Sequence, residues 1–162
     1  MERDIRYRTF VKHNIPSFLE SFREFKKLLD KLVRYELEMY DYAPDEIEKM
    51  LYNESQVSET IIPELEKGTC KVIGAFFDSV MVGYVLVGLE HDDVVYIRNI
   101  TVDDDYRSCG IGSTLLRMVE SMRGDLPLEV SIVDKNTRAM NFYQTLGFKV
   151  IDTYEPYILL RK

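Results

Sequence analysis

The spacing of the apolar residues changes at Gly68, and this change divides the chain into a helical first part and a strand-rich second part. Before Gly68, apolar side chains recur every three or four residues over 15–32, which is typical of one face of a helix. After Gly68 they alternate in three segments separated by short polar turns, at residues 70–77, 81–89 and 94–102. Strands joined by such short turns pair as an antiparallel meander.

The remaining segments add further strands and helices around this meander. Residues 4–10 alternate like a half-buried strand, Pro44 ends the first helical stretch, and Asp45 is placed to cap a second helix. Pro63 leaves open whether the helical pattern that ends at Gly68 is continuous. Beyond the meander we expect helices over 111–122 and 136–146 and strands over 128–133, 148–151 and 157–160. The sequence therefore predicts an α+β fold with a mixed, mostly antiparallel central sheet flanked by helices.

Composition favours one domain and excludes several classes of protein. The 162 residues are 46% apolar and 30% charged, which suits a single domain over 1–162. Cys70 and Cys109 are too few for a disulfide framework, and His13 and His91, far apart and without a cysteine pair nearby, predict no metal site. The charged N-terminus and the short apolar runs predict neither a signal peptide nor a membrane span, so we expect a cytoplasmic protein.

The net charge argues against nucleic acid and membranes as partners. With 21 basic and 28 acidic residues the formal charge is −7, which phosphate backbones and anionic lipids repel. Eight acidic residues lie between Asp41 and Glu66, where Lys49 is the single basic residue. Our hypothesis is that this segment attracts a cationic amine, and solvated helix faces explain the same charges equally well. The oligomeric state, monomer or homodimer, stays open.

A glycine loop joins the third strand of the meander to the helix over 111–122. Gly110 and Gly112 lack a Cβ, so successive backbone N–H groups can approach an anion closely. The positive end of the helix dipole lies at the same place, which predicts a pyrophosphate site that Arg107 can reinforce. The loop has neither the Gly-Lys-Ser/Thr of a nucleoside-triphosphate loop nor the third glycine of the dinucleotide fingerprint. A tight strand-to-helix turn without a ligand is the alternative.

Two motifs around this loop resemble the GNAT superfamily, the acyl-CoA-dependent N-acetyltransferases. Arg107-x-x-Gly110-x-Gly112 is similar to the R/Q-x-x-G-x-G/A loop of that family. Downstream, Asn136-x-x-Ala139-x-x-Phe142-Tyr143-x-x-x-Gly147-Phe148 is similar to the second half of the family's cofactor core. The resemblance covers residues 96–148, and the order of elements before them is similar too. It implies a GNAT-like fold and acetyl-CoA as cosubstrate.

The resemblance also implies where the cosubstrate binds. It assigns the pantetheine arm to the backbone of Ile100, Thr101 and Val102, and it gives the Ile100 amide a catalytic role in stabilising the thioester oxyanion. It implies that Asn136 contacts the arm and that the small Ala139 leaves room for it. The pyrophosphate is assigned to Arg107 and to the loop amides of Ser108, Cys109, Gly110, Ile111, Gly112 and Ser113.

Tyr143 is the predicted general acid. It follows Asn136 by seven residues, which places both side chains on one helical face, two turns apart. A phenol with a pKa of about 10 keeps its proton at neutral pH and can donate it to the departing thiolate. The alternative is a core tyrosine packed beside Phe142 and Phe148.

The general base stays unassigned. Many relatives carry a glutamate on the strand before the loop, and Tyr96 is the matching position here. Because an alkyl ammonium has a pKa of about 10.4, a group must take its proton, or the amine must arrive neutral. A water chain is one candidate, and the side-chain candidates are Glu90, His91, Asp92, Asp93, Tyr96 and Tyr84.

Three functions agree with these residues. The first is an N-acetyltransferase that moves an acetyl group from acetyl-CoA to a primary amine, preferentially a cationic one, by direct attack in a ternary complex. Its acceptor is a small-molecule amine or an amine of a peptide or protein. The second is a non-catalytic acyl-CoA-binding sensor module with the GNAT fold, and the third is a structural α+β domain without a cofactor. Direct attack needs no covalent enzyme, so no nucleophilic role is expected for Cys109.

Overall fold

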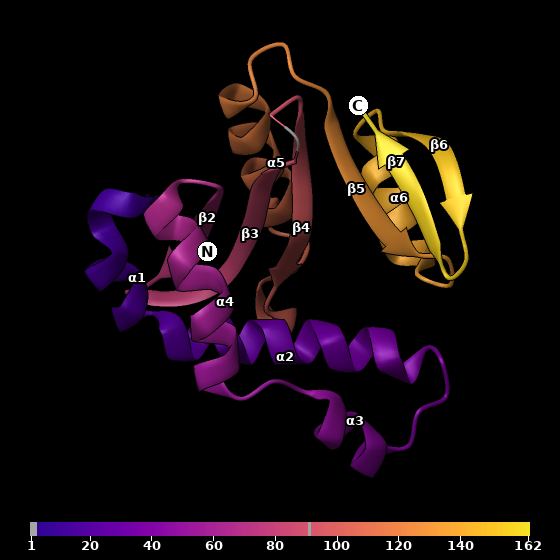
Figure 1. Ribbon diagram of the computed structural model, residues 1–162, viewed down its shortest axis with the longest axis horizontal. Coiled ribbons are helices and arrows are strands. Elements are labelled where there is room, and N and C mark those ends of the chain that lie inside the picture. Colours follow the sequence, from indigo (N-terminus) through magenta and orange to yellow (C-terminus); the bar gives the residue numbers. More distant parts are fainter. Residues whose placement is uncertain (1–2, 91) are drawn as a thin grey trace.

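One seven-stranded sheet organises the molecule, with helices on both of its faces (Figure 1). The computed structural model describes residues 3–90 and 92–162. The elements are β1 (Arg6–Phe10), η1 (Lys12–Asn14), α1 (Ile15–Glu20), α2 (Phe22–Glu38), α3 (Pro44–Met50), α4 (Glu54–Lys67), β2 (Cys70–Phe77), β3 (Val80–Glu90), β4 (Val94–Val102), η2 (Asp104–Tyr106), α5 (Ile111–Met122), β5 (Leu128–Val133), α6 (Thr137–Thr145), β6 (Lys149–Tyr154) and β7 (Tyr157–Arg161).

The strand order is β1-β2-β3-β4-β5-β7-β6, and every neighbouring pair except β4 and β5 is antiparallel. The predicted α+β fold with a mixed, mostly antiparallel sheet is therefore confirmed. The final hairpin folds back so that β7 inserts between β5 and β6, an order that the strand pattern alone did not predict.

The apolar stripe predicted over 15–32 forms two helices rather than one. At Ser21 the backbone leaves helical geometry, with φ −102° and ψ 6°, so α1 ends there and α2 begins at the next residue. The ring of Phe18 still packs edge to face on Phe22 and Phe25, with centroids 5.9 and 5.2 Å apart. The break changes the helix direction without interrupting the apolar face.

The structure corrects the predicted cap of α3 and settles the continuity of α4, which the sequence left open. Asp45 does not cap α3, because Ala43 holds the N-cap position and Asp45 lies in the first turn. α4 runs through Pro63 without a break and ends at Gly68, which takes the left-handed conformation with φ 74°. Within residues 3–90 and 92–162, no helix has the length and apolar character needed to cross a bilayer.

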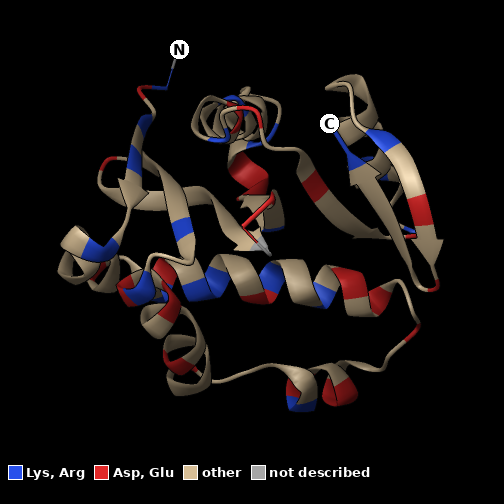
Figure 2. Ribbon diagram, turned by 45° about the horizontal axis from the view of Figure 1, so that its top comes forward, with Lys and Arg blue, Asp and Glu red and all other residues tan. Residues whose placement is uncertain are grey.

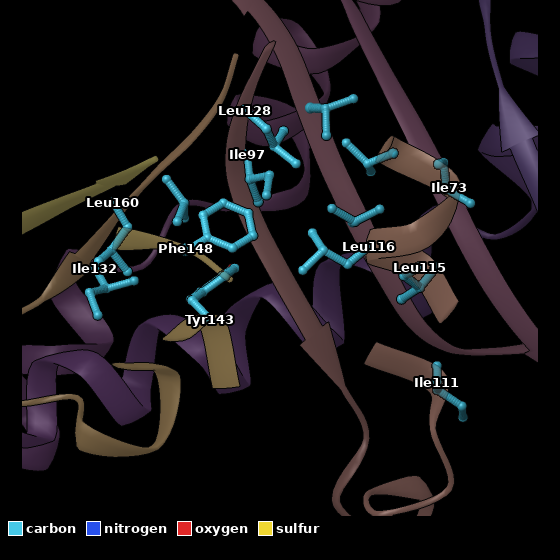
Figure 3. Close-up of a cluster of buried hydrophobic side chains, with 14 of the residues drawn as sticks. Ile73, Ile97, Ile111, Leu115, Leu116, Leu128, Ile132, Tyr143, Phe148 and Leu160 are labelled. Carbon is cyan, nitrogen blue, oxygen red and sulfur yellow. The ribbon is translucent and has the colours of Figure 1, made fainter. Parts of the chain in front are cut away.

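The sheet separates two apolar clusters. The first lies under α5 and α6 and includes Ile97, Leu115 and Tyr143 (Figure 3). The second lies under α1, α2 and α4 and includes Phe25 and Tyr84. Because neighbouring side chains of a strand point to opposite faces, β2 and β3 contribute to both clusters, whereas β4 and β5 contribute to the first cluster. The helices are thereby fixed on the sheet from both sides.

The parallel contact between β4 and β5 is short. The two strands pair only from Val95 to Ile97 on β4, and beyond Ile97 they separate (Figure 1). A register shift at the same place pairs Leu86 of β3 with Asn99, although Val87 pairs with Ile97. This bulge adds one residue to β4 and bends the strand away from its parallel partner.

α2 crosses the opening below the separated strands, as Figure 1 shows. Its C-terminal end is attached to the segment after β5. The Tyr40 hydroxyl donates to Oδ1 of Asp134 at 3.0 Å, and Lys135 Nζ donates to the Met39 carbonyl at 3.3 Å. The Arg138 guanidinium lies 4.5 Å above the Tyr35 ring. α2 is therefore held by both halves of the sheet.

Tyr84 provides a test of the second cluster. Its side chain is fully buried against Phe25, with ring centroids 4.3 Å apart, and its hydroxyl has no hydrogen-bond partner among the described residues. An unpaired buried hydroxyl costs about 1–3 kcal/mol. We predict that Tyr84→Phe raises the free energy of unfolding by about 1 kcal/mol in urea denaturation, whereas Tyr84→Ala lowers it by about 3–5 kcal/mol. A less stable Tyr84→Phe protein would show that the hydroxyl has a partner, such as a buried water.

Candidate active site

A pocket of about 700 Å³ fills the opening between β4 and β5. Its walls are β4 over 98–102, β5 over 130–132, the loop before α5, and parts of α2 and α6. This volume lies within the range of about 300–1,000 Å³ that is usual for small-molecule sites. Alternate residues of β4 beyond Ile97 direct their backbone groups away from β3 and find no strand partner there. The pocket thus offers a free strand edge to a ligand.

The pocket brings together the residues predicted to bind the cosubstrate, with one exception. Those that line it are Ile100, Thr101, Val102, Arg107, Ser108, Gly110, Ile111, Gly112, Ser113, Asn136, Ala139 and Tyr143. The exposed Cys109 does not line it, and its thiol lies 3.5 Å from the Arg107 carbonyl. A contact of Cys109 through its backbone amide stays a prediction, as do the individual roles of the other residues.

The glycine loop has the geometry of an anion site. Gly110 is the N-cap of α5 in the left-handed conformation with φ 78°, and Ser108 also has a positive φ of 60°. No side chain caps the helix, so the N–H groups of residues 111–113 lack intrahelical partners. A Cβ built at Gly110 has no atom within 4 Å, so the space before these amides is open. The amides and the helix dipole favour a negatively charged group there.

Two loop residues also have structural contacts that the sequence did not predict. A Cβ at Gly112 would lie 3.3 Å from the Phe142 ring, so this glycine allows α5 and α6 to approach closely. Arg107 forms an ion pair with Asp104 at 2.8 Å, and its Nε donates to the Val102 carbonyl at 3.3 Å. Arg107 therefore stabilises the loop itself at the edge of the pocket.

α6 presents Asn136 and Tyr143 to the pocket, on one face as their spacing predicts. Oδ1 of Asn136 accepts a hydrogen bond from the Ala139 amide at 3.0 Å and caps the helix, which leaves the side-chain nitrogen for a ligand. The Tyr143 ring packs edge to face on Phe142, with centroids 5.1 Å apart, and on Phe148, with centroids 5.2 Å apart. Figure 3 shows Tyr143 beside Phe148. Tyr143 is therefore both a core residue and a pocket residue.

The environment of Tyr143 keeps its phenol protonated. Burial raises the pKa of Tyr143 well above its ordinary value, and the negative charge of Glu36 raises it further. Both effects disfavour the phenolate, because one removes water and the other adds a like charge. A neutral phenol at the pocket can donate a proton to a developing anion.

The proposed turn candidates for the general base do not belong to the pocket. Asp92 and Asp93 lie in the exposed turn that precedes β4, whereas the part of β4 that lines the pocket begins at Arg98. His91 lies outside the described residues, and the structure does not describe the side chain of Glu90.

The two tyrosine candidates are poorly suited to accept a proton. Burial is the main cause that raises the pKa of Tyr84 and of Tyr96. A tyrosine acts as a base only as its phenolate, and a raised pKa makes that form rarer at neutral pH. Neither residue lines the pocket.

The acidic segment 41–66 does not line the pocket either. Instead, two of its residues neutralise arginines that do: Glu48 binds Arg34, and Glu64 binds both terminal nitrogens of Arg98. α3, which carries part of the segment, stands apart from the sheet (Figures 1 and 2). The segment therefore does not contact a ligand in the pocket, and its attraction of a cationic amine stays a hypothesis. Among the described residues, no three His, Cys, Asp or Glu side chains are grouped to hold a metal ion.

Glu36 is a pocket residue of chemical interest that sequence reasoning missed. It lies near the C-terminal end of α2, where acidic residues gather (Figure 2), and it lines the pocket with its side chain half-buried. Burial raises the pKa of its carboxyl group. The available signal was its position, because Glu36 follows Leu32 by four residues and so occupies the apolar stripe. A carboxylate at such a position needs an explanation, since charged groups avoid the core.

Comparison with known proteins extends the likeness beyond the motifs. The Acetyltransferase (GNAT) family model matches residues 26–148. Peptidyl-lysine N-acetyltransferase YjaB of Escherichia coli (strain K12) is 35% identical over 85 residues, which cover 49% of this chain and 53% of that protein. Thialysine N-epsilon-acetyltransferase of Bos taurus is 36% identical over 56 residues, 33% of each chain. The chain spans about half the length, or less, of these curated relatives.

The fold has solved counterparts as well. The crystal structure of PaiA N-acetyltransferase from Thermoplasma acidophilum, in complex with coenzyme A, aligns with a TM-score of 0.71 at 22% identity. The alignment covers 98% of both chains. At this identity the likeness shows the fold, and it confirms the GNAT-like architecture expected from the sequence.

The left-handed conformation of the loop can be tested by stability. We predict that Gly110→Ala lowers the free energy of unfolding by about 1–2 kcal/mol, because a Cβ disfavours a positive φ. Gly110→Asn should cost less, since asparagine visits this conformation more readily. Gly68→Ala is the matched control outside the pocket, with φ 74° and equally open surroundings. Urea denaturation measures all three, and unchanged stability in Gly110→Ala contradicts the conformation.

Proposed function

Since the chain belongs to the acetyltransferase (GNAT) family, we propose that it transfers an acetyl group from acetyl-CoA to a primary amine. The observation that carries this proposal is the anion site of the glycine loop, which opens onto the free edge of β4 in the same pocket as Tyr143. The continuous sheet, with β1 and β6 at its edges, supports the interpretation of residues 1–162 as a single domain.

The residues of the pocket fit the pyrophosphate and the pantetheine arm of acetyl-CoA. The amides of residues 111–113 would hold the pyrophosphate at the start of α5. The backbone of residues 100–102 and the side-chain nitrogen of Asn136 would bind the amides of the pantetheine arm, where β4 lacks a partner strand. When bound, acetyl-CoA supplies an acyl carbon that its thioester makes reactive toward amines.

Two residues would act on the reacting groups. The backbone amide of Ile100 would stabilise the negative charge that develops on the thioester oxygen. Tyr143 would donate its proton to the departing sulfur, consistent with a pKa that burial raises. Because Cys109 lies outside the pocket, these residues support direct attack by the amine in a ternary complex rather than a covalent enzyme.

The acceptor we propose is a cationic primary amine, on a small molecule or on a peptide. The named relatives act on peptidyl-lysine and on the ε-nitrogen of thialysine. An alkyl amine of this kind carries a positive charge at neutral pH, with a pKa of about 10.4. The carboxylate of Glu36 in the pocket is compatible with such a charge.

A binding experiment separates the enzyme from a structural domain without a cofactor. We predict that acetyl-CoA at a hundred times its Kd stabilises the protein by about 2.7 kcal/mol, seen as a higher Tm. Gly110→Val should lose this protection, because its side chain enters the space before the amides, whereas Gly68→Val should keep it. No protection of the wild-type protein at millimolar acetyl-CoA contradicts the proposed site.

A turnover experiment then separates the enzyme from a non-catalytic acyl-CoA sensor. Thiol release from acetyl-CoA is measured with a panel of cationic, neutral and anionic amines. Release that depends on a cationic amine supports the transferase. Tight acetyl-CoA binding without release for any amine supports the sensor, which is the alternative function.

Tyr143→Phe tests the general acid. We predict that it lowers kcat by about ten- to a thousandfold, because the departing sulfur loses its proton donor. The Kd for acetyl-CoA should change little, since the ring that packs on Phe148 is retained. Tyr52→Phe, at an exposed tyrosine outside the pocket, is the control. An unchanged kcat in Tyr143→Phe removes this residue from the reaction.

A further inference from the structure

The bulge in β4 turns an unsatisfied oxygen toward α2. Asn99 pairs directly with Leu86, and Leu86 belongs to the cluster under α1, α2 and α4. Directly opposed residues of paired strands share one face, so Asn99 also faces α2. Its Oδ1 is buried in the pocket wall without a hydrogen-bond partner among the described residues. A buried acceptor of this kind favours a ligand that brings N–H donors.

Glu36 reaches the same pocket from α2, and its half-buried carboxylate also lacks a partner among the described residues. In the part of the chain that the structure describes, no donor or cation pairs with its carboxylate, and burial alone accounts for its raised pKa. Ionised carboxylates that lose water are costly unless a partner compensates. Glu36 and Asn99 Oδ1 therefore supply acceptors to the pocket and no matching donor.

The cations of the pocket have other partners. Arg34 binds Glu48, Arg98 binds Glu64, Arg107 binds Asp104, Lys31 lies 3.4 Å from Asp103, and Arg138 stacks on Tyr35. The remaining ionisable group of α2 at the pocket is the exposed Glu38, and α6 adds the neutral phenol of Tyr143. Tyr84 lies behind this wall on β3, close enough for the charge of Glu36 to raise its pKa. These cations are engaged elsewhere, so a cationic ligand would supply the positive charge that Glu36 lacks.

Glu36 and Tyr143 lie on opposite sides of the opening. Glu36 belongs to the helix that covers one face of the sheet, and Tyr143 to the cluster on the other face. They are nevertheless close enough for the charge of Glu36 to raise the pKa of Tyr143. A thioester held along β4 between them would have a proton acceptor on one side and a proton donor on the other.

We infer that Glu36 is the general base of the transfer, and that its carboxylate and Asn99 Oδ1 together bind the ammonium group of the acceptor. This inference rests on the proposed function. In similar enzymes the base is a glutamate on the strand, and Tyr96 holds that position here. Glu36 would take over this role from α2, the helix packed against the pocket.

The proton and bond changes balance as follows. The carboxylate of Glu36 takes one proton from R–NH₃⁺, and the nitrogen lone pair then forms the C–N bond to the acetyl carbon as the C–S bond breaks. Tyr143 gives its proton to the sulfur and regains one from the acylated nitrogen. Glu36 releases its proton to solvent, so R–NH₃⁺ and acetyl-CoA yield the N-acetyl amine, CoA–SH and one H⁺.

Glu36→Gln tests the role, because the amide keeps the size of the side chain and removes the base. We predict that kcat for a cationic primary amine, such as a lysine-containing peptide, falls about 10²–10⁴-fold at neutral pH. The Kd for acetyl-CoA should stay unchanged. As pH rises toward the pKa of the amine, about 10.4, the free base becomes more abundant, and the difference from wild type should shrink about tenfold per pH unit.

Three further variants control the experiment. Glu24→Gln makes the same charge change on α2 outside the pocket, about 18 Å along the helix, and should leave kcat unchanged. Glu36→Asp retains a carboxylate and should recover part of the activity. Asn99→Ala should raise KM for the amine more than it lowers kcat. The Tm of Glu36→Gln should equal or exceed that of wild type, because an unpaired buried charge is removed.

The outcomes separate this inference from the proposed function. A wild-type protein that binds acetyl-CoA but acetylates no amine overturns the proposed transferase, and the role of Glu36 with it. An active wild type with an equally active Glu36→Gln variant overturns the role of Glu36 alone. A loss in Glu36→Gln that stays constant across pH overturns proton transfer by this residue.

Discussion

The separation of β4 from β5 after Ile97 is the constraint on which the site depends. A continuous ladder would satisfy the backbone groups of β4 with those of β5, and no ligand could reach them. The bulge beside Leu86 bends β4 where the parallel pairing stops, so the free edge and the glycine loop open into one pocket. A ligand with its own amide groups would pair with these backbone groups if it lay between the strands.

α2 compensates for the contacts that the sheet loses there. Its first half packs on the sheet through Phe25, while Tyr35 in its last turn and Tyr40 just beyond the helix contact the segment after β5. The helix therefore bridges the two halves across the opening and gives the pocket a fixed wall. The same arrangement places Glu36 where the apolar stripe would otherwise continue. A charged side chain therefore occupies a position where an apolar one would stabilise the fold. Such a compromise between stability and activity is common at functional sites.

Much of the fold could be predicted from the sequence, and so could the proposed general acid, but not the proposed general base. Local periodicity and glycine chemistry predicted β2, β4, α5 and β5 well, because those signals depend on a few neighbouring residues. The break at Ser21, the insertion of β7 beside β5 and the close approach at Gly112 depend on packing between distant segments, which no local pattern contains. The same distinction explains the site. The position of Tyr143 follows from its spacing to Asn136, whereas Glu36 is distant in the sequence and comes near Tyr143 only through the packing of α2.

The position of the proposed base follows from the same geometry. A strand residue can serve an amine only if its side chain points to the side from which the amine arrives. Tyr96 holds the strand position here, and the raised pKa of its half-buried phenol disfavours the charged form. Two residues beyond the end of the parallel pairing, Asn99 faces α2 and offers an acceptor without charge. The charge must then come from the element packed against that face, and among the pocket residues of α2 Glu36 is the half-buried carboxylate.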